Sequence, residues 1–289
     1  MGKDINNDNS FMIRLRSSVI LMAVAITSMI LGGYVLFSVI VLITMIGLME
    51  LLRVVKINKS GLGAVVYIFA LLYFLYLLLT ELLKYNEPWL NSIGTVFFPF
   101  FSALFLVFIL AVYVLNFPKY NSEQITLSFF AFFYVAVTLS YIFKVRNMES
   151  GAYTVWLIFI GSWGSDTMAY VVGRKLGKHK IAPKLSPKKS LEGLIGGIAG
   201  AALIGVIYAL IFKTQLEVSI SNPVLLFGLV GAVGSVVSQI GDMAASAIKR
   251  NKGIKDYGTL IPGHGGILDR FDSVIFIAPI VYYMLYFAL

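Results

Sequence analysis

The chain has 289 residues, 59% of them hydrophobic and only 13% charged, with a mean hydropathy of +0.88. This excludes an ordinary soluble domain, which carries roughly 25% charged residues, and indicates an integral membrane protein. Cysteine is absent, which excludes disulfides, a thiolate metal site and a cysteine nucleophile. With this hydropathy, the formal charge of +9 indicates anionic lipids or an anionic substrate rather than a nucleic acid.

The first half of the chain consists of apolar segments between short polar turns. Residues 1–16 form a polar tail with no signal-peptide cleavage site after it, and we expect it to be retained. The apolar sequence from 17 to 52 is too long for one span of about 20 residues, so it predicts a helical hairpin broken at Gly32-Gly33. Further spans are expected at 61–83, 92–117 and 125–143, with a turn at Tyr85–Pro88 and a kink at Pro99.

Polar residues enter the apolar sequence after residue 147. The expected span at 152–173 contains Asp166, which costs about 2.5 to 3.5 kcal/mol in lipid and should face a polar interior. The following loop, 174–190, carries seven lysines and arginines. These charges indicate either that the loop is cytoplasmic or that it binds an anion. A helix start at Ser190 and the glycines Gly173 and Gly177 favour the anion site.

Three more spans complete the chain, at 191–212, 223–248 and 274–287. The glycines of the first are typical of tight helix packing rather than of a ligand site. Asp242 and Ser246, four residues apart, share one face of the second. A second polar loop at 249–272 combines cations, carboxylates and His264 within a glycine-rich turn, as expected of a site for a phosphate-bearing substrate and a metal ion.

The distribution of charge fits an all-α membrane protein of about nine transmembrane helices. With a cytoplasmic N-terminus, the cytoplasmic side receives all but four of the 23 lysines and arginines. The exceptions are Lys84, Lys144, Arg146 and Lys213. We expect a tail (1–16), an N-terminal helical region (17–146) and a C-terminal catalytic region (147–289) with cytoplasmic loops at 174–190 and 249–272.

Two segments together resemble the phosphatidate cytidylyltransferases, the CDP-diacylglycerol synthases. The C-terminal match comprises Ser246, Lys249, Arg250, Lys255, Asp256, Pro262, His264, Gly265, Gly266, Asp269, Arg270 and Asp272. The upstream match comprises Asp166, Ala169, Tyr170, Gly173, Arg174, Gly177, Lys178, Pro183, Ser186, Pro187, Lys189, Ser190, Glu192 and Gly193. The resemblance covers roughly residues 160 to 273, and the first 145 residues match only as hydrophobic spans.

The resemblance implies transfer of a cytidylyl group from CTP to phosphatidate, giving CDP-diacylglycerol and pyrophosphate, in a plasma-membrane enzyme whose active site faces the cytoplasm. Asp242 and Asp269 are the expected Mg²⁺ ligands, with Asp166 and Asp272 next. The resemblance also implies a second metal ion, for which a monovalent cation is a candidate. Lys249, Arg250 and Arg270 join these acids as catalytic residues that balance phosphate charge.

Other residues of the two loops are expected to bind substrate. They are Lys178, Ser186, Lys188, Lys189, Ser190, Ser246, Lys255, Gly265 and Gly266. His264 either donates to a phosphate or holds its loop, while Asp256 is expected to be a solvated partner of a lysine. The expected partners are CTP, phosphatidate and membrane lipids, without nucleic acid, and the family suggests a homodimer. Two rival functions remain open at this point: an ion-coupled transporter, and a CTP-dependent enzyme acting on another lipid.

Overall fold

The computed structural model describes residues 2–83 and 88–289, with the side chains of residues 12, 16–80 and 96–289. The secondary structure of this part is helical, apart from two isolated β-bridges, Lys180 to Ser190 and Ile261 to Gly265. The chain divides into two compact units, one made of Met1–Ile40 with Tyr141–Leu289 and the other of Val41–Ser140. The first 40 residues thus belong with the C-terminal region, although the sequence suggested an N-terminal half.

Among the residues that the structure describes, seven helices are long and apolar enough to cross a membrane. They are Gly33–Val54, Gly61–Thr80, Val96–Leu115, Ser122–Arg146, Gly151–Leu176, Leu191–Ile211 and Pro223–Asn251. The first and last expected spans also form helices, α1 (Gly2–Leu31) and α13 (Leu268–Tyr286). Only Arg16–Leu31 of α1 is apolar, and α13 begins with charged residues, which shortens its apolar part. The all-α multi-pass fold is confirmed, with seven full-length spans where about nine were expected.

The expected break at Gly32-Gly33 is present. Helix α1 ends at Leu31 and α2 (Gly33–Val54) begins two residues later, with positive φ angles of 62° at Gly32 and 48° at Gly33. Arg146 Nε donates to the Met29 carbonyl oxygen at 2.9 Å, and its Nη2 to that of Ile30 at 3.3 Å. A cation therefore satisfies the free carbonyls at the end of α1, where the helix dipole favours positive charge.

The unit formed by Val41–Ser140 is held by aromatic packing. Its helices are α3 (Gly61–Leu83), α4 (Pro88–Leu115), α5 (Ser122–Ala131) and the π-helical segment η1 (Phe132–Val137). Phe105 and Phe132 are fully buried, with ring centroids 4.6 Å apart, and Phe69 lies 5.1 Å from Phe105. Pro99 lies inside α4, and the expected turn at Tyr85–Pro88 falls mainly outside the described residues.

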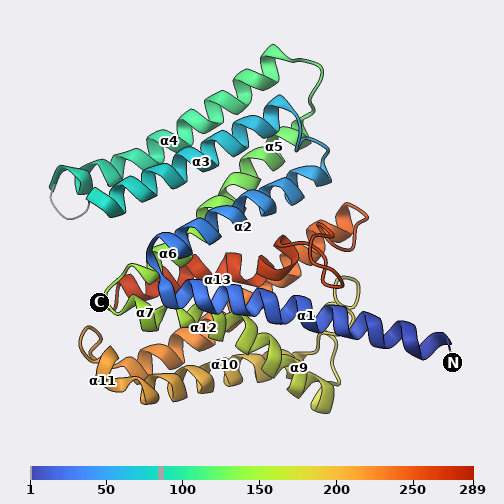
Figure 1. The fold of residues 1–289 in the computed structure, drawn as a ribbon, viewed down its shortest axis with the longest axis vertical. Coiled ribbons are helices and arrows are strands. Elements are labelled where there is room, and N and C mark those ends of the chain that lie inside the picture. Colours follow the sequence, from blue (N-terminus) through green and yellow to red (C-terminus); the bar gives the residue numbers. More distant parts are fainter. Residues whose placement is uncertain (1, 84–87) are drawn as a thin grey trace. The chain divides into compact units, whose positions relative to one another are not determined.

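The other unit contains the two polar loops and a bundle of helices (Figure 1). Its elements after α6 (Thr138–Arg146) are α7 (Gly151–Thr154), α8 (Trp156–Phe159), η2 (Ile160–Gly164), α9 (Ser165–Leu176), α10 (Leu191–Ile211), α11 (Lys213–Leu216), α12 (Pro223–Asn251) and α13. Helix α10 packs against α9 and α12, and α12 packs against α13. Two polar loops, 177–190 and 252–267, follow α9 and α12 and lie within this bundle's unit.

Glycine allows the close approach of α10 to its neighbours. A Cβ at Gly205 would lie 2.5 Å from the Phe227 carbonyl oxygen of α12, and one at Gly200 would overlap Met168 of α9. Small residues let membrane helices pack at short range, where dispersion and weak polar contacts hold them. The prediction that the glycines of span 191–212 serve helix packing is therefore confirmed, and this packing brings both α9 and α12 against α10, where they also contact each other.

Candidate active site

A buried polar network fixes the three helices that carry the acidic residues. Ser165 Oγ of α9 lies 2.6 Å from Ser235 Oγ of α12, and Gln239 Nε2 donates to Ser235 Oγ at 3.2 Å and to the Leu194 carbonyl oxygen of α10 at 3.3 Å. All three side chains avoid lipid, where an unpaired polar group is costly. Asp166 follows Ser165 directly and Asp242 is three residues after Gln239, so the network sets the positions of both carboxylates.

The helix leading to Asp166 is irregular. The segment η2 has π-helical hydrogen bonding and ends one residue before Ser165, where α9 begins. Short π segments inside α-helices occur frequently at functional sites, because they rotate the following residues relative to the regular register. Gly161 within η2 packs against the Ile277 side chain of α13, which would have to move to make room for a Cβ at this position. The π segment thus changes the direction in which the Asp166 side chain points, while the helix around it stays packed against α13.

The basic loop between α9 and α10 is held at the start of α10. Ser190 is the N-cap of α10 and accepts a hydrogen bond from the Gly193 amide at 3.2 Å, so the expected helix start is confirmed. The Glu192 carboxylate accepts bonds from the Lys178 amide at 3.0 Å and from His179 Nδ1 at 2.6 Å. Glu192 therefore anchors the start of the basic loop.

Two glycines of this region have a packing role. A Cβ at Gly173 would lie 3.2 Å from Ser190 Oγ, and one at Gly177 would lie 2.6 Å from the same atom. The sequence suggested that these glycines let backbone approach a phosphate. In the structure, they let the end of α9 approach the N-cap of α10, and Gly173 also lines a cavity described below, so the approach to a phosphate stays a prediction.

The loop between α12 and α13 is organised around Asp269. This buried carboxylate accepts hydrogen bonds from Lys249 Nζ at 2.8 Å, from the Tyr257 amide at 2.8 Å and from the Gly266 amide at 3.0 Å. Lys249 Nζ also lies 3.7 Å from Asp272 Oδ2. Burial, with a further contribution from Asp269 and Asp272, raises the pKa of Tyr257, and its protonated hydroxyl donates to the Ala245 carbonyl oxygen at 3.3 Å. Asp269 thereby joins both ends of the loop.

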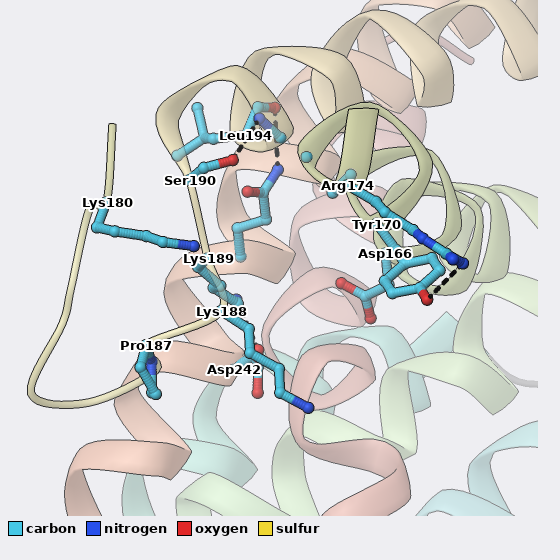
Figure 2. Close-up of a pocket in the computed structure, with 14 residues that line it drawn as sticks. Asp166, Tyr170, Arg174, Lys180, Pro187, Lys188, Lys189, Ser190, Leu194 and Asp242 are labelled. Carbon is cyan, nitrogen blue, oxygen red and sulfur yellow. Dashed lines mark hydrogen bonds and ion pairs between the residues drawn. The ribbon is translucent and has the colours of Figure 1, made fainter. Parts of the chain in front are cut away.

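A cavity of about 580 Å³ lies between the basic loop and the helices α9, α10 and α12. Its charged lining comes from Asp166 and Asp242 and from four cations, Arg174, Lys180, Lys188 and Lys189. Figure 2 shows Lys188 and Lys189 extending from the loop beside Asp242, with Asp166 on the opposite helix. Lys189 Nζ lies 2.6 Å from Asp242 Oδ2. Such a cavity suits a polyanion whose negative charge the lysines neutralise.

A second cavity of about 240 Å³ shares Asp166 with the first. Its polar lining includes His264, Asp269, Arg270 and Asp272, and its apolar lining includes Leu21 and Met22 of α1 and Trp163 of η2. Ser18 of α1 also lines it, and Ser18 Oγ lies 3.0 Å from His264 Nε2. The two cavities therefore adjoin at one carboxylate, Asp166.

The acidic residues fit a divalent cation that also binds phosphate. No group of three or more His, Asp or Glu side chains within the described residues could hold a metal ion by itself. Asp166 makes no hydrogen bond or ion pair with any described residue, and Asp242 faces the same cavity. Mg²⁺ is usually held by one or two carboxylates together with substrate phosphates and water. The donor set therefore fits Mg²⁺ bound jointly with a nucleotide.

The structure divides the expected site residues among several positions. Asp166, Asp242, Lys188, Lys189 and Ser190 line the larger cavity, whereas Asp166, Asp269, Asp272, His264 and Arg270 line the smaller one. Asp242 and Asp269, expected to act together, thus line different cavities. The other expected residues, all within the described chain, line neither: Lys178, Ser186, Ser246, Lys249, Arg250, Lys255, Gly265 and Gly266. Arg250 Nη1 instead donates to the Ile254 carbonyl oxygen at 3.1 Å.

Some lining residues were not expected from the sequence. Ser18, Leu21 and Met22 belong to an apolar segment that carried no signal of chemistry, and only the fold brings them to the second polar loop. Trp163 lies three residues before Asp166 in the same expected span, so its nearness to that carboxylate in sequence was a usable signal. Lys180 was within the basic loop but had no feature that separated it from its neighbours.

Known proteins resemble this chain over nearly its whole length. Residues 12–288 match the model of the cytidylyltransferase family. The chain is 31% identical over 269 residues to the phosphatidate cytidylyltransferase of Bacillus subtilis, covering 92% of this chain and 94% of the relative. It is 30% identical to that of Synechocystis, covering 93% and 94%, and 38% identical to that of Thermotoga maritima over 53% and 56%. This chain belongs to the cytidylyltransferase family.

Proposed function

We propose that the protein is a phosphatidate cytidylyltransferase, which transfers the cytidylyl group of CTP to phosphatidate. The observation that carries this proposal is the larger cavity, in which two carboxylates and four cations face one space at the ends of apolar helices. Relatives that match nearly the whole chain carry the same activity in their names. The reaction gives CDP-diacylglycerol, the activated lipid of phospholipid synthesis, and pyrophosphate.

The chemistry needs charge neutralisation more than a protein nucleophile. An oxygen of the phosphatidate phosphate attacks the α-phosphorus of CTP and forms the new P–O–P bond. The bond between the α-phosphorus and the α,β-bridging oxygen breaks, and that oxygen leaves with pyrophosphate. Because the attacking oxygen is already an anion, no side chain has to remove a proton. The main obstacles are repulsion between two anions and charge on the leaving oxygen, which fixed cations oppose.

Residues of the larger cavity are assigned to CTP. Lys188, Lys189 and Lys180 bind its phosphates, and Arg174 adds charge at the other side of the cavity. Asp166 and Asp242 hold Mg²⁺, which neutralises phosphate charge when bound. Asp272 is the next candidate ligand. A second, monovalent cation is placed beside the acidic residues that the two cavities share.

Residues of the second loop are assigned to support and to phosphate binding. Asp269, proposed as a metal ligand from the sequence, has its oxygens engaged by Lys249 and two amides, so any ion there shares it with these donors. Lys249 holds Asp269, while Arg250, Arg270 and Lys255 contribute positive charge near the substrates. Ser186, Ser190, Ser246, Lys178, Gly265 and Gly266 shape the two loops around them.

The proposed setting is the plasma membrane of a bacterial cell. The basic loops face the cytoplasm, where CTP is available, and this agrees with the excess of cations in those loops. Membrane lipids surround the apolar helices. A homodimer formed through small-residue helix faces is consistent with the family and is part of the proposal.

The test is direct synthesis with the purified protein. The full chain in detergent is given radiolabelled CTP, phosphatidate and Mg²⁺, and the lipid phase is analysed with and without EDTA. We expect label in CDP-diacylglycerol only when metal is available. Label that appears only with a different phospholipid would indicate another lipid acceptor. Folded protein that binds no CTP would contradict the proposal and favour a transporter.

A further inference from the structure

The basic loop between α9 and α10 is closed by a short antiparallel pairing of its two ends. Lys180 and Ser190 form an isolated β-bridge. Two backbone hydrogen bonds flank this bridge, one of 2.8 Å on the side of the helices and one of 3.3 Å on the side of the loop. We call the paired residues, 179–181 and 189–191, the neck. The turn formed by residues 182–188 therefore begins and ends at a fixed backbone pairing.

One carboxylate ties the neck to α10. Glu192 Oε2 accepts a hydrogen bond from the Lys178 amide at 3.0 Å, and Oε1 accepts bonds from the His179 amide at 3.2 Å and from His179 Nδ1 at 2.6 Å. An ionised carboxylate only accepts hydrogen bonds, so the imidazole carries a proton on Nδ1. Glu192 lies in the first turn of α10. Its three bonds therefore hold the residues that follow α9 against a rigid helix.

The pairing in the neck decides which side chains face the larger cavity. Lys180 and Ser190 lie opposite each other, and both line this cavity. Opposed residues of an antiparallel pair place their side chains on the same face, and a shift of one residue turns a side chain to the other face. Figure 2 shows Lys180 on one side of the loop and Lys188 and Lys189 on the other. The register of the neck therefore sets the positions of three cavity lysines.

The two ends of the loop are held by different contacts. At the end that leads into α10, Ser190 caps the helix, and Lys189 Nζ lies 2.6 Å from Asp242 Oδ2. At the end that follows α9, Glu192 and His179 make the side-chain contact. Lysines that extend into one cavity repel one another until an anion is bound, and this repulsion favours an open loop. The contact between Glu192 and His179 opposes that opening.

We infer that Glu192 and His179 are positioning residues for nucleotide binding. Their contact fixes the register of the neck and so keeps Lys180, Lys188 and Lys189 in the arrangement that receives the nucleotide phosphates. This inference rests on the proposed function. Neither Glu192 nor His179 lines either cavity, and the His179 side chain is 78% exposed, so both act through the lysines rather than on the substrate.

The test measures CTP binding by the full chain in detergent, with Mg²⁺ and without phosphatidate, so that no turnover occurs. Glu192→Ala is expected to raise the Kd for CTP roughly ten-fold, as it would if the loop kept the binding arrangement for about a tenth of the time. His179→Leu should raise it roughly three-fold, because the amide bonds to Glu192 remain. His179→Asn should restore most of the affinity, since its amide nitrogen falls near the place of Nδ1.

The turnover rate gives a second reading of the same variants. With phosphatidate present and CTP at saturation, kcat should change little in Glu192→Ala and His179→Leu, because bound nucleotide itself draws the lysines together. The KM for CTP should rise with the Kd. A loss of kcat without a change in the Kd for CTP would overturn the inference, because the two residues would then act on a later step.

A double-mutant cycle separates positioning from a general loss of stability. If Glu192 acts through the lysines, Glu192→Ala should raise the Kd for CTP by about three-fold or less when Lys189 is already alanine. Equal factors with and without Lys189 would overturn the positioning role and would show that Glu192 only supports α10. Glu149 is an exposed carboxylate outside both polar loops, and Glu149→Ala is the control that should leave the Kd unchanged.

The outcomes distinguish this inference from the proposed function. Variants of Glu192 and His179 that bind CTP as tightly as the unsubstituted protein would overturn the inference alone. The expected pattern of CTP binding, in a protein that forms no CDP-diacylglycerol, would support the inference and count against the proposed function. An unsubstituted chain that binds no CTP would overturn both.

Discussion

Lys189 Nζ of the basic loop lies 2.6 Å from Asp242 Oδ2 of α12 and joins two segments that are more than fifty residues apart in sequence. The side chains are 23% and 30% exposed, so this ion pair lies at the wall of the larger cavity rather than in the core. We propose that each partner exchanges the other for a ligand when substrate and metal bind. A nucleotide phosphate suits Lys189, and a metal ion suits Asp242.

Removing the Lys189 charge should weaken nucleotide binding. In Lys189→Ala, the KM for CTP is expected to rise roughly ten-fold or more, because a charge-assisted bond to phosphate is lost. The KM for phosphatidate should change little. Steady-state kinetics with each substrate varied in turn measures both values.

The same loop supplies the control for this experiment. Lys184 is exposed and does not line the larger cavity, so Lys184→Ala removes equal charge from the loop. We expect its KM for CTP to stay within about two-fold, since exposed charges are largely screened. Equal effects of the two substitutions would mean that the loop acts through its total charge, and Lys189 would lose its assigned role.

The dependence of turnover on Mg²⁺ should require the Asp242 carboxylate. EDTA is expected to abolish turnover and Mg²⁺ to restore it. The carboxylates of the larger cavity are themselves negative, so they can help to neutralise phosphate charge only by holding a metal ion. Asp242→Asn should raise the Mg²⁺ concentration needed for half-maximal rate, measured by titrating Mg²⁺ at saturating CTP. Glu217→Gln is the control, since Glu217 is an exposed residue paired with Lys213. An unchanged Mg²⁺ requirement in Asp242→Asn would remove Asp242 from the metal site.

Loss of Asp269 should reduce stability as well as activity. The sequence alone predicts that Asp269→Asn removes a metal ligand and leaves the protein folded. In the structure, this change removes the shorter of the two ion pairs of the buried Lys249 and leaves Asp272, whose Oδ2 lies 3.7 Å from Lys249 Nζ. Breaking a buried ion pair costs up to about 3 to 5 kcal/mol, and the remaining pair lowers this cost. We expect a lower unfolding temperature, measured by thermal denaturation in detergent.

A double substitution distinguishes the two explanations of Asp269. Lys249→Met combined with Asp269→Asn removes both partners of the shorter pair and should recover part of the lost stability, because the buried lysine charge is gone. The recovery is limited because the buried Asp272 also loses Lys249. Turnover should stay low in the double variant, because the carboxylate that Asp269 contributes to the lining of the smaller cavity is still absent. A single variant as stable as the original protein would show that the Lys249–Asp269 pair does not stabilise the fold.

Helix packing at Gly200 gives a test that is independent of chemistry. Gly200→Val should destabilise the protein by about 1 to 3 kcal/mol, because the added methyl groups overlap Met168 of α9. The neighbouring Ala199 is exposed, so Ala199→Val adds the same bulk to the outer side of α10 and should be tolerated. Comparable unfolding temperatures for the two variants would contradict the close α9–α10 contact.

Local features of the sequence determined the helical membrane fold and much of the site. The break at Gly32-Gly33 follows from glycines inside an overlong apolar run, and the start of α10 at Ser190 follows from an N-cap residue before apolar sequence. The two polar loops were recognisable because charged residues are costly between membrane-length apolar segments. These features depend on composition and on spacing of a few residues, which a sequence displays directly.

Only the tertiary structure placed α1 beside the second polar loop and divided the acidic residues between two adjoining cavities. Ser18 and His264 are separated by 246 residues, and nothing near either residue in the sequence indicates the other. The roles of Asp269 and Glu192 as acceptors for loop amides likewise depend on how each loop folds back on its helix. Such contacts are set by the packing of whole helices, where many small dispersion contacts and a few buried hydrogen bonds decide the arrangement together.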